Sequence, residues 1–481
     1  MTALFPPLVR EIPYAAPCSV FEVVRMDRSF LLESVKGPGR IARYSFIGFD
    51  PYLEFLAKDG GVEIVVGDRM TVSYRRPLER LRELVNCYRQ QTMEGLPPFL
   101  GGAAGIFSYD FVRYLEEIPQ KASDDLQVPD AHFFMIDRLI AFDHILRKAW
   151  VVVCPGARET VLGFTELESD IGGMTREADA VAEDISRKIS EAIDRTESCA
   201  RRGKGTGIQV RQDISRDDYV EMVKRAKEYI AAGDIFQANL SLRVSADVGG
   251  IDAWEVYKVL REINPSPFAS FFDFGGYQIV SSSPERLVRV SGRIIDTRPI
   301  AGTRPRGRDV DEDAEMRAEL LLNEKERAEH IMLIDLERND IGRVADFGSV
   351  HVDELMVTED YSHVIHIVSN VEGRLAEGKD CFDVIAAVYP GGTITGVPKV
   401  RCMEIIDELE PFRRGPYTGS LGYIGFNGCM DLNIIIRTFL IKDGRAYIQA
   451  GAGIVADSDP EREYNECNKK AEALLRTLER L

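Results

Sequence analysis

Short apolar runs separated by glycine and aspartate dominate the N-terminal third of the chain. Residues 41–75, which include "EFLAKDGGVEIVVGDRMTVSY", predict several short β-strands, because period-two alternation ends there at turn-forming residues. The stretch "AHFFMIDRLIAFDHILRKAWVVV" (131–153) predicts two more strands around a charged turn, and residues 77–91 predict a helix. We therefore expect a mixed α and β structure in this part.

The pattern changes between residues 172 and 212. "GGMTREADAVAEDISRKISEAIDRTES" predicts a charged amphipathic helix, and the "CARRGKGTGIQ" that follows has little apolar content. We expect a domain junction at 196–212, between an N-terminal domain (1–195) and a C-terminal domain (213–481). Just beyond it, Ser215 is a candidate N-cap for a helix that Gly233 would end.

Composition narrows the class of protein. The chain has 481 residues, 45% of them hydrophobic, and a formal net charge of −18, which argues against a nucleic-acid partner. No segment approaches the ~20 apolar residues of a membrane span. The first residues lack the basic and apolar regions of a signal peptide. We expect a cytoplasmic protein with no membrane partner.

Carboxylates at helical spacing recur in two segments of the C-terminal half. Glu326 and Glu329 lie three apart in "NEKERAEHIMLIDLERND", and Glu463, Glu466 and Lys470 step by three and four in "DPEREYNECNKKAEALLRTLERL". On a helix each set would share a face. Either set alone is typical of a solvated helix face and identifies no site.

Three glycine-containing loops accompany these carboxylates: "DTRPIAGTRPRG" (296–307), "YPGGTITGVPK" (389–399) and "YIQAGAGIVADS" (447–458). Glycine lets backbone N–H groups approach a ligand closely. Together with the carboxylates, and without a His or Cys cluster, the loops favour a small dicarboxylate bound with Mg²⁺. The chain has no G-x-S-x-G nucleophile elbow, and "GAGIVADS" matches the dinucleotide-binding fingerprint poorly.

Ordered motifs along nearly the whole chain resemble the chorismate-using enzymes. They include "FLLESVKGPGRIARYSFIGFDP", "GGAAGIFSYDFVRYLE", "DIFQANLSLR", "ERAEHIMLIDLERNDIGRV" and "QAGAGIVADSDPEREYNE". They are most similar to component I of anthranilate synthase and of aminodeoxychorismate synthase. The resemblance implies an α+β fold with two large antiparallel-rich sheets packed in a sandwich with surrounding helices. It also implies chorismate, which has two carboxylates and a C4 hydroxyl leaving group, as the substrate.

The resemblance further implies roles for individual residues. Glu329 and Glu466 would hold Mg²⁺, with Glu463 nearby, and Glu326 would be the general acid, its pKa raised by the neighbouring carboxylates. His366 would lie near the substrate and assist proton movement, although a hydrogen-bonded core histidine is the alternative. The chorismate-binding residues would be Tyr417, Arg437, Gly451 and Gly453 at the enolpyruvyl carboxylate, and Gly302, Thr303, Thr393 and Lys470 along the ring. Packing is the alternative role for Tyr417, and pairing with a buried acid is the alternative for Arg437.

One position bears on the nucleophile. Relatives that add water carry a lysine base at the position of Gln237, and a glutamine cannot deprotonate water. The resemblance therefore favours ammonia, which is already nucleophilic. Since the chain has no glutaminase nucleophile motif, a separate glutamine amidotransferase subunit (component II) is the expected partner.

The position of amination divides the two closest branches. Ala301 stands where many aminodeoxychorismate synthases have a nucleophilic lysine, which favours anthranilate synthase, whereas Ala238–Asn239 and Asn433 resemble the aminodeoxychorismate branch and its lysine-free subgroup. We expect 4-amino-4-deoxychorismate as the product, with anthranilate plus pyruvate as the alternative. Asn239, Thr395 and Asn433 are the candidate wall residues for this choice. Segments similar to the tryptophan pocket of anthranilate synthase suggest an aromatic effector site, at Leu32, Glu33, Ser34, Asn264 and Pro265.

Overall fold

The computed structural model describes residues 6–39, 41–74, 76–163, 171–193, 207–360 and 364–481. Residues 196–206 of the expected junction lie outside this part of the chain. Within the described residues, two sheets of twelve strands each form the centre of the molecule, and every strand pair in them is antiparallel.

The first sheet has the order β1-β10-β9-β3-β2-β13-β14-β23-β24-β12-β11, with β20 also paired to β12. Its strands are β1 (Leu8–Ile12), β10 (Lys148–Val153), β9 (Arg138–Asp143), β3 (Tyr44–Gly48), β2 (Phe30–Glu33), β13 (Phe268–Asp273), β14 (Tyr277–Ser283), β23 (Thr438–Lys442), β24 (Arg445–Ile454), β12 (Gln237–Asp247), β11 (Val210–Gln212) and β20 (Gly396–Val397).

The second sheet has the order β17-β19-β16-β15-β22-β21-β7-β8-β4-β5-β6, with β18 also paired to β19. Its strands are β17 (Ile300–Pro305), β19 (Val364–Arg374), β16 (Ile294–Thr297), β15 (Arg286–Ser291), β22 (Met430–Ile434), β21 (Ser420–Gly425), β7 (Gly102–Phe107), β8 (Ala131–Ile136), β4 (Leu53–Lys58), β5 (Gly61–Val66), β6 (Arg69–Ser73) and β18 (His351–Asp360).

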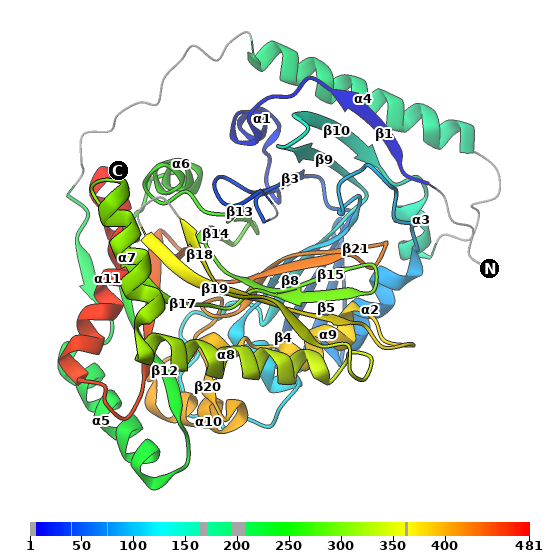
Figure 1. Cartoon of the computed structure of the whole chain (residues 1–481). Coiled ribbons are helices and arrows are strands. Elements are labelled where there is room, and N and C mark those ends of the chain that lie inside the picture. The colour runs from blue at the N-terminus through cyan, green and yellow to red at the C-terminus, as the bar shows by residue number, and fades with distance from the viewer. Residues whose placement is uncertain (1–5, 40, 75, 164–170, 194–206, 361–363) are drawn as a thin grey trace.

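Helices cover the outer faces of both sheets (Figure 1). Those on the first sheet are α1 (Pro17–Val24), α4 (Ile171–Ile193), α5 (Arg216–Ala232), α6 (Ala253–Ile263), α10 (Lys399–Leu409) and α11 (Pro460–Arg480). Those on the second are α2 (Pro77–Cys87), α3 (Ala157–Leu162), α7 (Val310–Leu322), α8 (Glu324–Gly342) and α9 (Cys381–Val388). Two 3₁₀ turns, η1 (Tyr109–Tyr114) and η2 (Gly392–Ile394), complete the elements.

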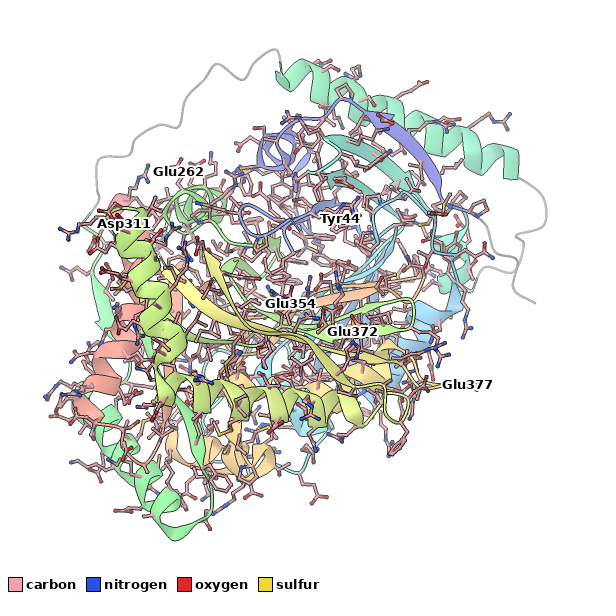
Figure 2. The ribbon with its side chains drawn as sticks, viewed as in Figure 1. Tyr44, Glu262, Asp311, Glu354, Glu372 and Glu377 are labelled. Carbon is pink, nitrogen blue, oxygen red and sulfur yellow. The ribbon has the colours of Figure 1, made fainter. Side chains whose placement is uncertain are left out.

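The hydrophobic core follows these layers. One cluster joins the first sheet to its helices, a second joins the second sheet to its own, and a third lies between the sheets. Phe30 and Phe272 of the first sheet and Phe134 of the second are fully buried members of the third cluster. Side chains fill the space between the sheets (Figure 2). The α+β sandwich implied by the resemblance is therefore confirmed.

The stretch 131–153 forms three strands, not the two that its pattern predicted. β8 belongs to the second sheet and β9 to the first, and only Asp137 separates them. Both strands are buried almost throughout, because the layers of the sandwich cover both their faces. Each strand is therefore a largely apolar run without alternation, and the Asp137–Arg138 pair between them does not indicate that the chain changes sheet.

Each sheet combines strands from both sides of the expected junction. β2 pairs with β13 in the first sheet, and β7 pairs with β21 in the second. The helix after the junction is confirmed in detail, since Ser215 accepts a hydrogen bond from the amide of Asp218 and Gly233 ends the helix with φ 84°. No described helix is long and apolar enough to cross a membrane.

Candidate active site

Two neighbouring strands bring together four of the predicted residues. Asn239 on β12 is opposite Gly453 on β24, and Ser241 is opposite Gly451. A Cβ atom on Gly453 would lie 2.6 Å from the side-chain nitrogen of Gln237, and one on Gly451 would lie 2.5 Å from Oδ1 of Asn239. At Gly451 a side chain would also meet the carbonyl of Leu240 at 2.9 Å, so glycine is favoured there, whereas at Gly453 only the flexible end of Gln237 would have to move.

A buried glutamate that the motif analysis missed lies beside the predicted residue Thr393. The hydroxyl of Thr393 donates to Oε1 of Glu285 at 3.0 Å, and the amide of Ile300 also donates to this carboxylate. Glu285 is 7% exposed. It therefore connects two of the glycine-containing loops, 296–307 and 389–399.

Burial raises the pKa of Glu285 to about 7, although the bond from Thr393 and the charges of Arg437 and Lys470 act in the opposite direction. Glu285 can therefore carry a proton near neutral pH. A single glutamate in "SSSPERL" has no partner at helical spacing, so the sequence pattern gave little reason to select it.

The predicted carboxylates of α8 and α11 lie close enough to influence one another. Burial raises the pKa of Glu329, and the negative charges of Glu326 and Glu466 raise it further. Burial likewise raises the pKa of Glu463, and Glu466 adds to this shift. Lys470 links these carboxylates to β24, since its Nζ lies 2.9 Å from Glu466 and donates to the carbonyl of Gly451 at 3.0 Å.

These side chains fit Mg²⁺ as a pair of carboxylates, not as a finished cage. Over the described ranges, no group of three or more His, Cys, Asp or Glu side chains is arranged to hold a metal ion. Mg²⁺ is usually bound by one or two carboxylates together with water and substrate oxygens. Glu329 and Glu466 come from different helices, and their negative charges repel each other. A divalent cation bound between them would remove this repulsion.

Glu326 lies at the edge of this group. One of its oxygens would be 3.0 Å from a Cβ on Gly302, and the other forms an ion pair with Arg304 at 3.2 Å. An arginine partner suits an ionised carboxylate better than a neutral acid. Compared with Glu326, the buried Glu285 therefore has the environment expected of a proton donor.

His366 lies on β19 next to the same loop. Its Nδ1 is 3.0 Å from Oγ1 of Thr303 and 3.2 Å from the carbonyl oxygen of Gly302. Burial lowers the pKa of His366 to about 4, and the nearby charge of Arg437 lowers it further. The imidazole is therefore neutral at physiological pH and can orient the loop or relay a proton only in that form.

Two non-glycine residues near this site adopt left-handed backbone conformations. Arg437 has φ 51° and Thr418, next to Tyr417, has φ 60°. Such conformations cost of order 1 kcal/mol and concentrate where surrounding structure fixes a functional side chain. Tyr417 is half-buried, and its hydroxyl would be 2.9 Å from a Cβ on Gly451, so the phenol lies near the carboxamide of Asn239.

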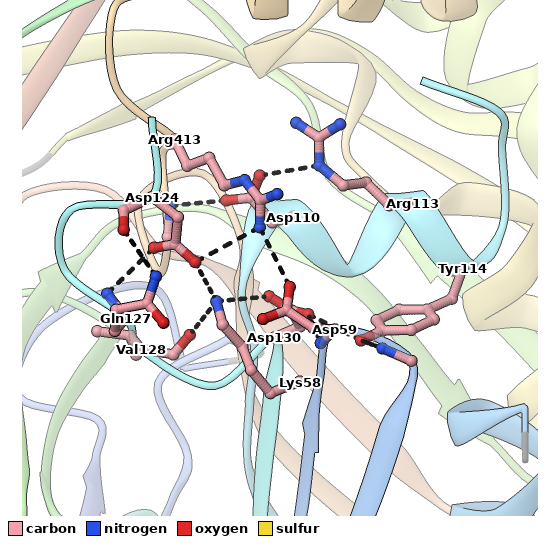
Figure 3. Close-up of polar contacts among 12 residues, drawn as sticks. Lys58, Asp59, Asp110, Arg113, Tyr114, Asp124, Gln127, Val128, Asp130 and Arg413 are labelled. Carbon is pink, nitrogen blue, oxygen red and sulfur yellow. Dashed lines mark hydrogen bonds and ion pairs between the residues drawn. The ribbon is translucent and has the colours of Figure 1, made fainter. Parts of the chain in front are cut away.

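A polar cluster from the N-terminal half holds the chain just before Tyr417 (Figure 3). Arg413 pairs with Asp124 at 3.4 Å, and the same carboxylate also binds Lys58. Asp110 accepts a hydrogen bond from the amide of Gly415 at 2.9 Å. The N-terminal half therefore helps to position a wall of the candidate site.

The three candidate wall residues divide between two places. Thr395 is fully buried in the 389–399 loop, and its carbonyl accepts from the amide of Asn239 at 2.8 Å. The carboxamide of Asn433 instead accepts from the amide of Leu421 at 3.0 Å and lines a separate cavity between the sheets. Asn239 lies beside the glycines of β24, whereas Thr395 lies on the opposite edge of β12, next to β20.

That separate cavity has a volume of about 720 Å³ and includes three of the five residues predicted for an effector site. Leu32, Glu33 and Ser34 line it, whereas Asn264 and Pro265 do not. Asn264 ends α6, and its side chain is bonded to Ser282 at 2.9 Å. Pro267 and Phe268, a few residues further along the chain, line the cavity instead.

Comparisons with known proteins agree with this architecture. The chorismate binding enzyme family matches residues 27–476, and the chain belongs to that family. Anthranilate synthase component 1 of Acetivibrio thermocellus is 44% identical over 470 residues, which cover 96% of this chain and 92% of that protein. Aminodeoxychorismate synthase component 1 of Bacillus subtilis (strain 168) is 42% identical over 478 residues, which cover 98% and 97%.

A solved structure gives the same result. The crystal structure of anthranilate synthase component I from Streptococcus pneumoniae TIGR4 matches with a TM-score of 0.76 and 36% identity, and covers 90% of this chain and 92% of that one. Within the family, the chain is thus similar to component I of two synthases, and these comparisons do not separate them.

Proposed function

We propose that this chain is component I of an aminodeoxychorismate synthase, which converts chorismate and ammonia into 4-amino-4-deoxychorismate and water. In this reaction a C–N bond forms and the C4–O bond breaks, so the departing hydroxyl must receive a proton. The observation that supports loss of the C4 hydroxyl, a step that both candidate reactions share, is the buried Glu285, held by Thr393 and able to keep a proton near pH 7. We assign the role of general acid to Glu285 in place of Glu326.

Two predicted basic residues near this acid support the proposal. Arg437 and Lys470 lie near Glu285 and supply positive charge for the carboxylates of chorismate. Glu329 and Glu466 would hold Mg²⁺, with Glu463 close by. Bound there, the ion would neutralise a substrate carboxylate and fix the orientation of the ring.

The residues of β12 support amination over hydration. Gln237 and Asn239 are both buried carboxamides, and neither can remove a proton from water. Ammonia needs no such base. An amidotransferase subunit that releases ammonia from glutamine is the partner we propose, because the similar proteins are named component 1.

Anthranilate synthase is the second candidate. Ala301 is 7% exposed and offers no nucleophile for a covalent adduct, and the relatives named above include anthranilate synthases. Asn239 favours the first candidate, because the resemblance at Ala238–Asn239 is to the aminodeoxychorismate branch and its side chain lies at the candidate site.

One product assay separates the two candidates. The purified chain is incubated with chorismate, Mg²⁺ and an ammonium salt at alkaline pH, and the products are resolved by chromatography. We expect 4-amino-4-deoxychorismate. Anthranilate and pyruvate as sole products would establish the second candidate, and no aminated product would overturn both.

A further inference from the structure

Helix α7 is held to the rest of the protein by a small apolar cluster and by ion pairs. The cluster has three buried residues, Leu320 of α7 and Ile365 and Ile367 of β19. The side chains of Val310 and Leu322, at the two ends of the helix, are 81% and 74% exposed. Burial of so little apolar surface stabilises the position of a helix only weakly. The ion pairs therefore decide how firmly α7 is held.

Two of these ion pairs lie away from the candidate metal ligands. Nε of Arg306, which follows β17, donates to the carboxylate of Asp313 in α7 at 3.0 Å. Arg317 of α7 donates to the carboxylate of Asp360 in β18 at 2.5 Å. Both pairs fasten the helix to its neighbours, and neither includes a glutamate expected to bind Mg²⁺.

A third arginine, Arg304 on β17, contacts both of the helices that meet at Asn323 (Figure 1). Asn323 ends α7 and caps α8, where its Oδ1 accepts from the amide of Glu326 at 3.0 Å. Nε of Arg304 donates to Glu319 of α7 at 3.1 Å, and Nη1 donates to Glu326 of α8 at 3.2 Å. One guanidinium therefore joins the two helices on either side of their corner.

The same corner lies against the loop expected at the chorismate ring. A Cβ atom on Gly302 would be 3.0 Å from Cδ1 of Leu320 in α7 and 3.0 Å from Oε2 of Glu326 in α8. Both helices therefore cover Gly302. A change in the angle between α7 and α8 would change the space beside this residue.

Glu326 connects this corner to the candidate metal site. After burial, the negative charge of Glu326 is the largest contribution to the raised pKa of Glu329, so the two carboxylates lie within electrostatic range. A divalent cation held by Glu329 and Glu466 would attract the Glu326 carboxylate and repel the Arg304 guanidinium. The pair of Arg304 and Glu326 is partly exposed, and ion pairs of this kind are weak enough for a divalent cation to break.

We propose that Arg304 is a metal-sensitive clasp, which holds the corner of α7 and α8 over Gly302 in the metal-free protein. When a divalent cation occupies the candidate metal site, Glu326 leaves Arg304 and α7 loosens. The inference rests on the metal site of the proposed function. It makes Arg304 a positioning residue, which acts through Glu326 and links metal occupancy to the freedom of one wall of the ring site.

Metal affinity is the first test. Mn²⁺, which prefers oxygen ligands as Mg²⁺ does, is titrated against the full chain without chorismate, and free Mn²⁺ is counted by electron paramagnetic resonance. Glu466→Gln measures the background from other sites. Arg304→Gln removes the competitor for Glu326 and should tighten Mn²⁺ binding about fivefold, the upper value for a partly exposed ion pair.

Arg317→Gln is the matched control for the affinity measurement. It removes the same positive charge and also breaks an ion pair that holds α7, but this pair does not include Glu326. At an ionic strength of about 0.15 M, long-range effects of the lost charge are largely screened. The affinity for Mn²⁺ should therefore change by less than about twofold.

Hydrogen–deuterium exchange of α7 is the second test. In the wild-type chain, saturating Mn²⁺ should speed exchange in residues 310–322 about threefold or more, because the clasp opens. In Arg304→Gln these amides should exchange at the faster rate without metal, and Mn²⁺ should add nothing. A purely structural role for Arg304 would speed exchange in the variant and leave the wild-type chain insensitive to Mn²⁺.

Thermal unfolding identifies variants that fail to fold. If Arg304→Gln is among them, Glu319→Gln takes its place, because this change breaks the α7 arm of the clasp and leaves Glu326 paired. Glu319→Gln should show fast, metal-insensitive exchange in α7 and wild-type affinity for Mn²⁺. Slow exchange that still responds to Mn²⁺ in Glu319→Gln would overturn the clasp.

The outcomes separate this inference from the proposed function. If Mn²⁺ leaves α7 exchange unchanged in the wild-type chain, the clasp is overturned, even when the chain aminates chorismate. Equal tightening of Mn²⁺ binding in Arg304→Gln and Arg317→Gln would also overturn it, because net charge alone would then explain the effect. If the chain forms no aminated product but both metal results hold, the proposed function fails and the clasp stands.

Discussion

The hydroxyl of Thr393 donates a hydrogen bond of 3.0 Å to the carboxylate of Glu285. Thr393 comes from the loop after α9, and Glu285 precedes β15, so the bond joins two segments far apart in the chain. The bond connects Thr393, which the sequence motifs predicted as a site residue, to Glu285, which they did not predict. The chemistry of the candidate site follows from this contact, since it places a buried acid beside the loop expected at the chorismate ring.

Glu285→Gln should lower kcat by about 10² to 10⁴-fold, because the departing hydroxyl would lose its proton donor. Glu326→Gln should have a smaller effect on kcat, since the Glu326 carboxylate is paired with Arg304. Single-turnover measurements at saturating chorismate compare the two variants. A larger loss of kcat in Glu326→Gln would return the role of general acid to that residue.

The rate should fall as pH rises through about 7, when it is measured at constant free ammonia. The pKa of Glu285 is raised to about 7, so the protonated acid disappears above that pH. The hydrogen bond from Thr393 lowers this pKa, and Thr393→Val should therefore move the alkaline limb to higher pH. If the alkaline limb of the pH–rate profile does not move in either Thr393→Val or Glu285→Gln, it reports the titration of another group.

Glu329→Gln and Glu466→Gln should each raise the Mg²⁺ concentration needed for half-maximal activity by about tenfold or more, because outright loss of a carboxylate ligand removes charge and geometry together. Glu472→Gln is the control, since Glu472 is an exposed carboxylate on the same helix as Glu466. Magnesium titrations of activity and circular dichroism of the folded variants provide the measurement. If both variants keep the wild-type dependence on Mg²⁺, Glu329 and Glu466 are not metal ligands and belong to ordinary solvated helix faces.

His366 should make the protein less stable in acid. Its pKa is about 4 in the folded chain, below the ordinary value of 6.5, so below that value the unfolded chain binds a proton that the native state does not. The free energy of unfolding should fall by up to about 1.4 kcal/mol per pH unit from this group between roughly pH 6.5 and 4. Urea titrations of wild type and His366→Gln at pH 7 and pH 5 measure it, and equal pH dependence in the two proteins would contradict it.

The isolated chain should use ammonium salts and not glutamine. Addition of a glutamine amidotransferase subunit should make turnover glutamine-dependent, because the chain has no glutaminase nucleophile motif of its own. The measurement is the rate of chorismate consumption with each nitrogen donor. Glutamine-driven turnover by the purified chain alone would overturn the expected partnership.

Local patterns predicted the parts of the fold that depend on local physics. The helix from Ser215 to Gly233 was predictable because its cap and its terminator are encoded at its ends. The carboxylates of α8 and α11 were placed together by resemblance, since spacing alone gives only a shared helix face. Glu285 could not be found in this way, because its significance comes from burial by segments distant in the sequence. The change of sheet at Asp137 was hidden for a similar reason: strands buried on both faces lack alternation.

The pairing of β7 with β21 has a consequence for synthesis of the protein. β7 ends at Phe107, and its partner strand begins only at Ser420. During translation the N-terminal half of the second sheet must wait, with unpaired backbone groups along the edge of β7, until most of the chain has left the ribosome. Such an edge can template association with other chains. Completion of the second sheet should therefore be a late and cooperative event, and slow synthesis or premature termination should favour aggregation over a folded fragment.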